Sequence, residues 1–366
     1  MFYKKCKIEL LTITRIVFCY KCMSKISEFV SLGHPDKIAD YISEFILDEL
    51  IKQDKYTKYA LEVQIKDNHV CLGGEISTNA EVDYDLIVKK AIEDIGYTQQ
   101  YCEYWGKENT INVNELKITK CIGKQSNEIF QGVKNDGWGD QGIMFGMAVN
   151  LPQYNYFSKD YFLAKKVNNL LFNKAKNWEN EEEKIGLDIK SLVVYDDNND
   201  KINKIIVAIP IKTNNTKNIE QFIRDSINGD YELIVNGTGC YTKHASIGDA
   251  GTTGRKLVVD FYGGCSNVGG GCPWTKDGTK ADLTLNLYAR KLALDYVKKQ
   301  NVNFIKVGIA CCIGKSTLDI TYFDENNKEI KSYSEEKTPT ELIKLFNLDK
   351  PIYGTLCKQG LFSMII

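Results

Sequence analysis

Two stretches of the chain carry apolar residues on both sides of a short polar turn, and in the first stretch these residues alternate with polar ones. The first covers residues 59–76, with its turn at 66–68, and the second covers 190–211, with its turn at 196–200. This pattern predicts antiparallel β-hairpins. Hairpins are not the units of a doubly wound parallel sheet, in which a crossover helix follows each strand. A Rossmann fold is therefore not expected.

Helical patterns lie before, between and after the two hairpins. Apolar residues with the spacing of one helix face predict helices at 36–51, 82–95 and 280–299. Further strands are expected at 256–262, 304–313 and 318–323. Hairpins mixed irregularly with helices predict an α+β fold.

Length, charge and cysteine usage narrow the classes of protein further. At 366 residues the chain is long enough for two or three domains. Its 47 basic and 48 acidic side chains give a net charge of -1, so no overall basic field favours nucleic acid. The 12 cysteines follow no repeated spacing, which indicates reduced thiols rather than a disulfide framework.

The first 22 residues are a candidate extension ahead of Met23. Glu9 and Arg15 interrupt their apolar stretch, which is too short to cross a membrane, and no small-residue cleavage site follows. We therefore expect a cytoplasmic protein with no membrane partner.

Charged residues accompany glycine in four parts of the chain. They lie at 31–37, at 123–126 with 139–142, at 248–256 and at 269–282. Each alone could be an ordinary helix start or surface loop, and 248–256 lacks the glycine spacing of a P-loop. Together, a His-Pro-Asp-Lys helix start and two basic glycine loops favour a polyphosphate and Mg²⁺ site.

Five ordered signatures resemble one family, S-adenosylmethionine synthetase, also called methionine adenosyltransferase. They lie at 27–40 (Ser-Glu-x-Val-Ser-x-Gly-His-Pro-Asp-Lys-Ile-Ala-Asp), 73–76 (Gly-Gly-Glu-Ile), 139–146 (Gly-Asp-Gln-Gly-Ile-Met-Phe-Gly), 248–256 (Gly-Asp-Ala-Gly-x-Thr-Gly-Arg-Lys) and 276–282 (Lys-Asp-x-Thr-Lys-x-Asp). The resemblance spans nearly all of 24–330. It implies an enzyme that transfers the adenosyl group of ATP to the sulfur of L-methionine and releases triphosphate, which is then hydrolysed to pyrophosphate and phosphate.

The resemblance also implies roles for individual residues. Those expected to act on the triphosphate are His34, Lys190, Arg255, Lys256, Lys276 and Lys280. Those expected to hold the substrates are Glu28, Glu75, Gln125, Asp140, Asp188, Tyr241 and Asp249. Those expected to bind metals are Asp36 and Asp282 for Mg²⁺, and Glu62 for K⁺.

The family fold has three similar domains with pseudo-threefold symmetry. Transferred to this chain, it predicts an extension at 1–23 and domains at 24–125, 137–236 and 237–366, with the chain interleaving between domains. It also implies a homodimer, able to pair into a homotetramer, with active sites at the subunit interface.

Some segments depart from the family pattern. The loop at 126–138 is shorter than in typical members, 242–246 and 268–275 are altered, and the usual final segment is lacking. They raise an alternative in which the chain is a catalytically impaired homologue that acts as a nucleotide-binding regulatory subunit. Retention of the charged positions favours the active enzyme, because clustered cations without a ligand repel one another.

Overall fold

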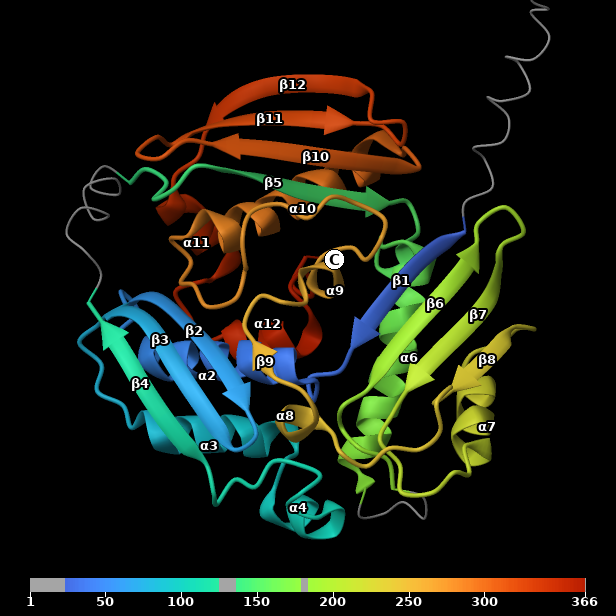
Figure 1. Ribbon diagram of the computed structural model, residues 1–366. Helices are drawn as coiled ribbons and strands as arrows, with labels where there is room; N and C mark the ends of the chain where they lie inside the picture. Colours follow the sequence, from blue (N-terminus) through green and yellow to red (C-terminus); the bar gives the residue numbers. More distant parts are fainter. Residues whose placement is uncertain (1–23, 125–135, 179–183, 366) are drawn as a thin grey trace, which may run out of the picture.

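Three four-stranded sheets dominate the part of the chain that the computed structural model describes, residues 24–124, 136–178 and 184–365 (Figure 1). The first has the strand order β1 (Lys25–Val30), β6 (Lys190–Asp196), β7 (Lys201–Ala208) and β8 (Glu232–Val235). The second has the order β4 (Lys117–Gly123), β3 (His69–Ser77), β2 (Lys58–Lys66) and β9 (Gly251–Thr252). The third has the order β12 (Glu329–Glu336), β11 (Thr317–Phe323), β10 (Phe304–Cys311) and β5 (Gly142–Val149).

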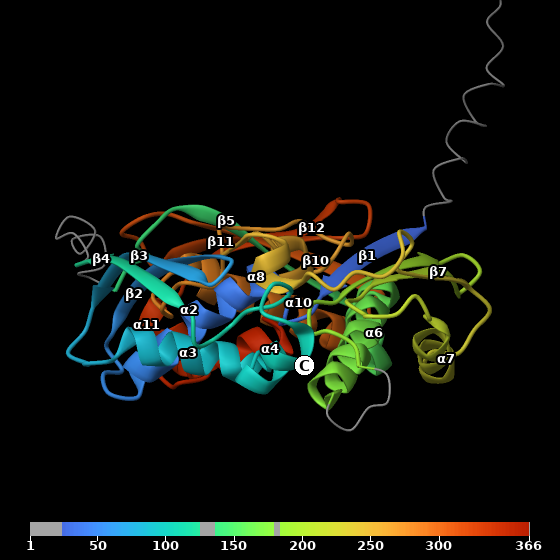
Figure 2. The ribbon, with the colours of Figure 1, turned by 60° about the horizontal axis from the view of Figure 1, so that its bottom comes forward.

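Helices cover one side of these sheets. The first sheet is accompanied by α6 (Lys159–Lys176) and α7 (Lys217–Ser226), and the third by α10 (Ala281–Gln300) and α11 (Pro339–Phe346). The second sheet carries α2 (Pro35–Ile51), which packs on β2. Two further helices, α3 (Tyr84–Ile95) and α12 (Tyr353–Gln359), pack on α2. Figure 2 shows α3, α4 (Gln99–Trp105), α6 and α7 on the side of the molecule opposite the sheets. Among the described residues, no helix is long and apolar enough to span a membrane.

The sequence-based prediction of an α+β fold is confirmed. The hairpin expected at 59–76 is β2 and β3, paired antiparallel from Lys58 with Ser77 to Lys66 with His69. The hairpin expected at 190–211 is β6 and β7. The helices expected at 36–51, 82–95 and 280–299 correspond to α2, α3 and α10 within two residues at each end.

One predicted strand, 256–262, is wrong. This segment contains a short helix, α9 (Leu257–Asp260), which packs against β1. Residues 259–262 are all buried, whereas a strand turns successive side chains to opposite faces. The helical turn allows Asp260 to reach Lys37 on α2, with 2.6 Å between carboxylate Oδ1 and ammonium Nζ.

Each of the three sheets combines strands that are far apart in the chain. Strand β1 pairs with β6, some 160 residues later, and β5 pairs with β10. Strand β9 joins the second sheet through Gln64 and Ile65 of β2. The domain bounds at 24–125, 137–236 and 237–366 stay a prediction, and the extension at 1–23 lies outside the described residues.

Helix α2 packs against β2, β9, α3 and α12 and is buried along nearly its whole length. Its apolar residues Ile38, Ile42, Ile46 and Leu47 are inaccessible to solvent. Its charged residues Asp36, Lys37, Asp40 and Glu44 are also buried, which is costly unless each has a partner. The three carboxylates find partners in the glycine-rich segments of the sequence, and Lys37 pairs with Asp40 and Asp260.

Candidate active site

The first glycine-rich segment forms the start of α2. Gly33 is required there because a Cβ at this position would lie 2.3 Å from the carbonyl oxygen of Leu187. His34 is the N-cap, and its Nδ1 accepts a hydrogen bond from the Asp36 N–H at 3.2 Å. With Nδ1 acting as acceptor, the ring proton is assigned to Nε2.

The His34 imidazole is neutral in this environment. Burial lowers its pKa to about 3, and the positive charges of Lys256 and Lys190 act in the same direction. The Nε2–H group is therefore a neutral hydrogen-bond donor at physiological pH.

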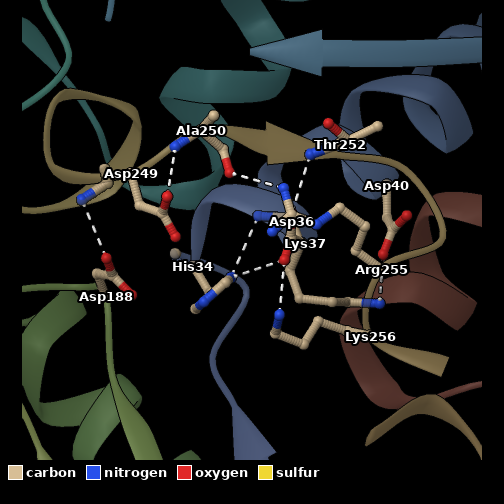
Figure 3. A network of polar contacts seen from close by, with 12 residues as sticks. His34, Asp36, Lys37, Asp40, Asp188, Asp249, Ala250, Thr252, Arg255 and Lys256 are labelled. Atoms are coloured by element: carbon tan, nitrogen blue, oxygen red, sulfur yellow. Dashed lines mark hydrogen bonds and ion pairs between the residues drawn. The ribbon is translucent and has the colours of Figure 1, made fainter. Parts of the chain in front are cut away.

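Asp36 joins the start of α2 to the third glycine-rich segment (Figure 3). Its Oδ2 lies 2.6 Å from Lys256 Nζ, its Oδ1 accepts the Thr252 N–H at 2.9 Å, and Arg255 Nε lies 3.5 Å from Oδ1. Burial alone would raise the pKa of Asp36, but the Lys256 ammonium and the Thr252 N–H outweigh it and keep the pKa below its usual value. The structure thus brings three of the predicted residues, Asp36, Arg255 and Lys256, together beside His34.

Asp188, Lys190, Tyr241 and Asp249 adjoin the same region. Burial raises the pKa of Asp188 to about 6, opposed by the Ala245 N–H bond at 3.0 Å and by the nearby charge of Lys190. Burial also raises the pKa of Tyr241, and Asp188 adds to this effect. In Figure 3, Asp188 and Asp249 lie to one side of His34, with Arg255 and Lys256 to the other.

A second group forms around the start of α10. Lys276 pairs with Asp282, whose Oδ1 also accepts the Gly271 N–H at 2.8 Å. Lys280 pairs with the buried Asp277, which is not among the predicted site residues, with 2.7 Å between Nζ and Oδ2. Asp140 lies close by, since its carbonyl accepts a hydrogen bond from Cys311, whose thiol also senses the charge of Asp282.

The two groups meet through their loops. A Cβ on Gly254, in the third glycine-rich segment, would lie 2.9 Å from the Cβ of Cys272 in the fourth. Glu62 links both segments, because it accepts hydrogen bonds from the hydroxyl groups of Thr253 and Thr275. The loops that carry Lys256 and Lys276 are therefore packed against each other.

The remaining predicted residues lie farther out. Glu28 on β1 and Glu75 on β3 are exposed, and Glu75 stands opposite Ala60, which bridges to Lys276. Gln125, and residues 126–135 of the loop predicted to be shortened, lie outside the described residues.

The altered segments are integrated into the buried interior. In 242–246, His244 is buried and contacts the Tyr101 hydroxyl, while Ala245 supplies the N–H that Asp188 accepts. In 268–275, the buried Trp274 donates from Nε1 to Asp260 at 2.9 Å, and Lys37 lies 4.6 Å above its ring.

Sequence reasoning missed two residues that contact these loops, Asp40 and Glu44 of α2. Asp40 accepts the N–H of Gly254, and Glu44 accepts the N–H of Thr275. A signal was present in the sequence, because acidic residues follow one another at four-residue spacing from Asp36 to Asp48, on a single face of the helix.

Neutral histidine, clustered cations and single carboxylates, carried by glycine-rich loops, are features of an enzyme that acts on a polyphosphorylated substrate. Comparison with known proteins identifies the enzyme family. The family model for the S-adenosylmethionine synthetase N-terminal domain matches residues 23–127, and that for the C-terminal domain matches 244–365. The chain belongs to the S-adenosylmethionine synthetase family.

Individual relatives agree with this assignment. The S-adenosylmethionine synthase of Mycoplasma capricolum is 35% identical, with 92% of each chain covered. That of Borrelia garinii is 33% identical, with 91% of each covered. A solved structure described as an unusual S-adenosylmethionine synthetase from Campylobacter jejuni has a TM-score of 0.82 at 29% identity, and covers 93% of this chain and 95% of its own. The enzyme prediction is thereby confirmed, and none of these relatives favours the regulatory alternative.

Proposed function

We propose that this chain makes S-adenosylmethionine from ATP and L-methionine at the site formed around His34, Asp36 and Lys256. The sulfur attacks C5′ of ATP, the C5′–O bond breaks, and its electrons leave with the triphosphate, which water then cleaves to pyrophosphate and phosphate. The proposal rests on one observation, that the cations converge on the buried N-terminus of α2. Lys256 Nζ lies 2.6 Å from Oδ2 of Asp36 in the first turn of that helix.

The triphosphate end of this reaction needs stabilisation of negative charge. Lys190, Arg255 and Lys256 surround His34 and supply fixed positive charge where the leaving group gains electrons. The neutral His34 donates its Nε2–H toward the departing oxygen. Methionine needs no general base, because its thioether is already nucleophilic, and so the protein contributes mainly orientation and charge.

The other predicted residues divide between the two substrates. Asp188 and Tyr241 are close together beside this cluster and face the adenosine. Asp249, Glu75 and Gln125 bind the charged ends of methionine. Lys276, Lys280, Asp140 and Glu28 complete the polyphosphate region.

The residues present fit the expected metals. Mg²⁺ commonly binds through one or two carboxylates together with substrate phosphates, and Asp36 and Asp282 each offer one such carboxylate beside a phosphate-binding cation. Glu62 and the hydroxyl groups of Thr253 and Thr275 form an oxygen-rich position suited to K⁺. When bound, Mg²⁺ offsets part of the triphosphate charge.

We further propose that the enzyme is a cytoplasmic homodimer that can pair into a homotetramer. Large apolar side chains are exposed on two strands and a short helix, with Ile26 at 51%, Ile143 at 58% and Val258 at 47%. A second copy of the chain that covers these side chains would remove their apolar surface from water. A mass measured in solution tests this directly, and a monomer at micromolar concentration would refute it.

Replacement of Lys276 tests the site with a matched control. Lys276 and Lys291 both pair with an aspartate on α10, but only Lys276 belongs to a glycine-rich loop. Lys276→Ala should lower S-adenosylmethionine formation by about 100-fold or more, since one missing electrostatic partner of a transition state costs about that much. Lys291→Ala should leave formation unchanged. Normal turnover in Lys276→Ala would refute the assigned role.

A further inference from the structure

Four acidic residues of α2 hold backbone N–H groups from other parts of the chain. They occupy one helix face at four-residue spacing and are Asp36, Asp40, Glu44 and Asp48. Asp36 accepts from Thr252, Asp40 from Gly254 at 2.9 Å, Glu44 from Thr275 at 2.6 Å, and Asp48 from Tyr353 and Gly354. The first three bonds reach the two loops that carry the phosphate cations, whereas Asp48 reaches α12.

The residues held by Asp40 and Glu44 share a backbone feature. Both have left-handed geometry, with φ of 75° at Gly254 and 74° at Thr275. Each directly precedes a proposed catalytic cation, Arg255 in one loop and Lys276 in the other. The bend at these positions therefore sets the direction in which each cation leaves its loop.

Thr275 is the more informative of the two. Glycine adopts left-handed geometry without cost, but a β-branched residue does so only where its surroundings enforce it, and such strain concentrates at functional sites. The bond from its N–H to Glu44 is joined by one from Leu61 N–H to its carbonyl, at 3.1 Å, and by one from its hydroxyl to Glu62, at 3.2 Å. Thr275 is thus fixed through its N–H, its carbonyl and its side chain.

We propose that Glu44 is a positioning residue for catalysis, which holds Thr275 in its strained geometry and so aims Lys276, while Asp40 does the same for Arg255 through Gly254. The inference rests on the proposed function, because it takes Lys276 and Arg255 as phosphate cations. Glu44 itself is completely buried below the site, and it contacts neither substrate nor cofactor in this role.

The charge of Glu44 is not what the role requires. Its Oε2 is buried without a hydrogen-bond partner among the described residues, and burial raises the pKa of this carboxyl well above its usual value. What the role requires is the acceptor Oε1, which takes the Thr275 N–H at 2.6 Å. A glutamine has the same size and offers the same acceptor, whereas a leucine fills the space without one.

These properties define the test. We compare Glu44→Gln, Glu44→Leu and, as a control on the same helix face, Asp48→Leu, by kcat, by KM for ATP and methionine, and by thermal unfolding. Glu44→Leu should lower kcat by about 100-fold, the usual effect of displacing a reacting partner by an ångström, and Glu44→Gln should keep kcat within about threefold. Asp48→Leu should lower the unfolding temperature comparably, but keep kcat near the wild-type value.

The outcomes separate this inference from the proposed function. Wild-type kcat in Glu44→Leu, or an equal loss of kcat in Glu44→Leu and Asp48→Leu, would overturn the positioning role while Lys276→Ala stays inactive. Normal turnover in Lys276→Ala would instead refute the site itself. Should Glu44→Leu not fold, Glu44→Asp replaces it: its shorter side chain withdraws the acceptor, and kcat should fall by about tenfold, with faster amide hydrogen exchange in residues 272–278. Unchanged kcat and exchange in a folded Glu44→Asp protein would also overturn the role.

Discussion

Acidification should destabilise this protein through His244, a residue of the altered segment 242–246. Its Nδ1 lies 2.6 Å from the carbonyl oxygen of Thr242, which can only accept, so Nδ1 carries the proton. Nε2 then accepts a hydrogen bond from the Tyr101 hydroxyl at 2.9 Å, and Tyr101 in turn accepts the Leu187 N–H at 3.0 Å. A second proton on Nε2 would break this chain inside the core.

The magnitude follows from the pKa of His244. Burial lowers that pKa from 6.5 to about 4, and the bond to Thr242 offsets only part of the effect. Because the folded-state pKa is depressed, the stabilisation is fully present above pH 6.5 and is lost as the pH falls from there toward about 4, where the folded form also takes up the proton. Each pH unit in that interval costs about 1.4 kcal/mol, so the loss between about pH 7.5 and about pH 5 is about 2 kcal/mol.

The assay is urea unfolding of the wild-type protein and His244→Asn at both pH values. Other groups, including His34, contribute to the wild-type pH dependence, and the difference between the two proteins isolates His244. The wild type should lose about 2 kcal/mol more than the variant on acidification. Equal losses in the two proteins, or a His244 imidazole that titrates near its ordinary pKa by NMR, would refute the reasoning.

Two further substitutions test the packing around the site. Gly251→Ala should destabilise the protein by about 1–3 kcal/mol and lower its activity. The added Cβ would lie 2.0 Å from the Pro35 carbonyl oxygen and push the start of α2 away. An unchanged unfolding temperature would contradict this contact. Arg290→Leu should cost about 3 kcal/mol or more in urea unfolding, since the buried guanidinium donates to the carbonyl oxygens of Met147 and Asn155, which would lose their donor. A variant as stable as the wild type would show that these carbonyls find other partners.

Local periodicity explains which elements could be predicted from the sequence. The strands β2 and β3 alternate buried residues with more exposed ones around a polar turn, and α3 buries one face along its length. Both patterns can be recognised in the sequence alone. Strand β12 is mostly exposed and shows no alternation, and β9 has two residues, so neither has a readable pattern. At 257–260, apolar β-branched residues resemble a strand, but the contact of Asp260 with Lys37 requires a helical turn.

The residues of the site that lie in short sequence motifs could be predicted. Those that act through contacts with distant parts of the chain could not. Glycine-rich motifs marked His34, Asp36, Arg255 and Lys256, which the fold brings together. Glu44 lies 231 residues from Thr275, so the sequence around either residue does not indicate their hydrogen bond. The strain at Thr275 is likewise invisible in a sequence, because φ is a property of the folded backbone.

The most direct test is incubation of the purified wild-type protein with ATP, L-methionine, Mg²⁺ and K⁺, followed by quantification of every product. We predict S-adenosylmethionine, pyrophosphate and phosphate in equal amounts, because one triphosphate is released and cleaved for each adenosyl group transferred. An ATP-binding protein that forms no S-adenosylmethionine under these conditions would contradict the enzyme assignment.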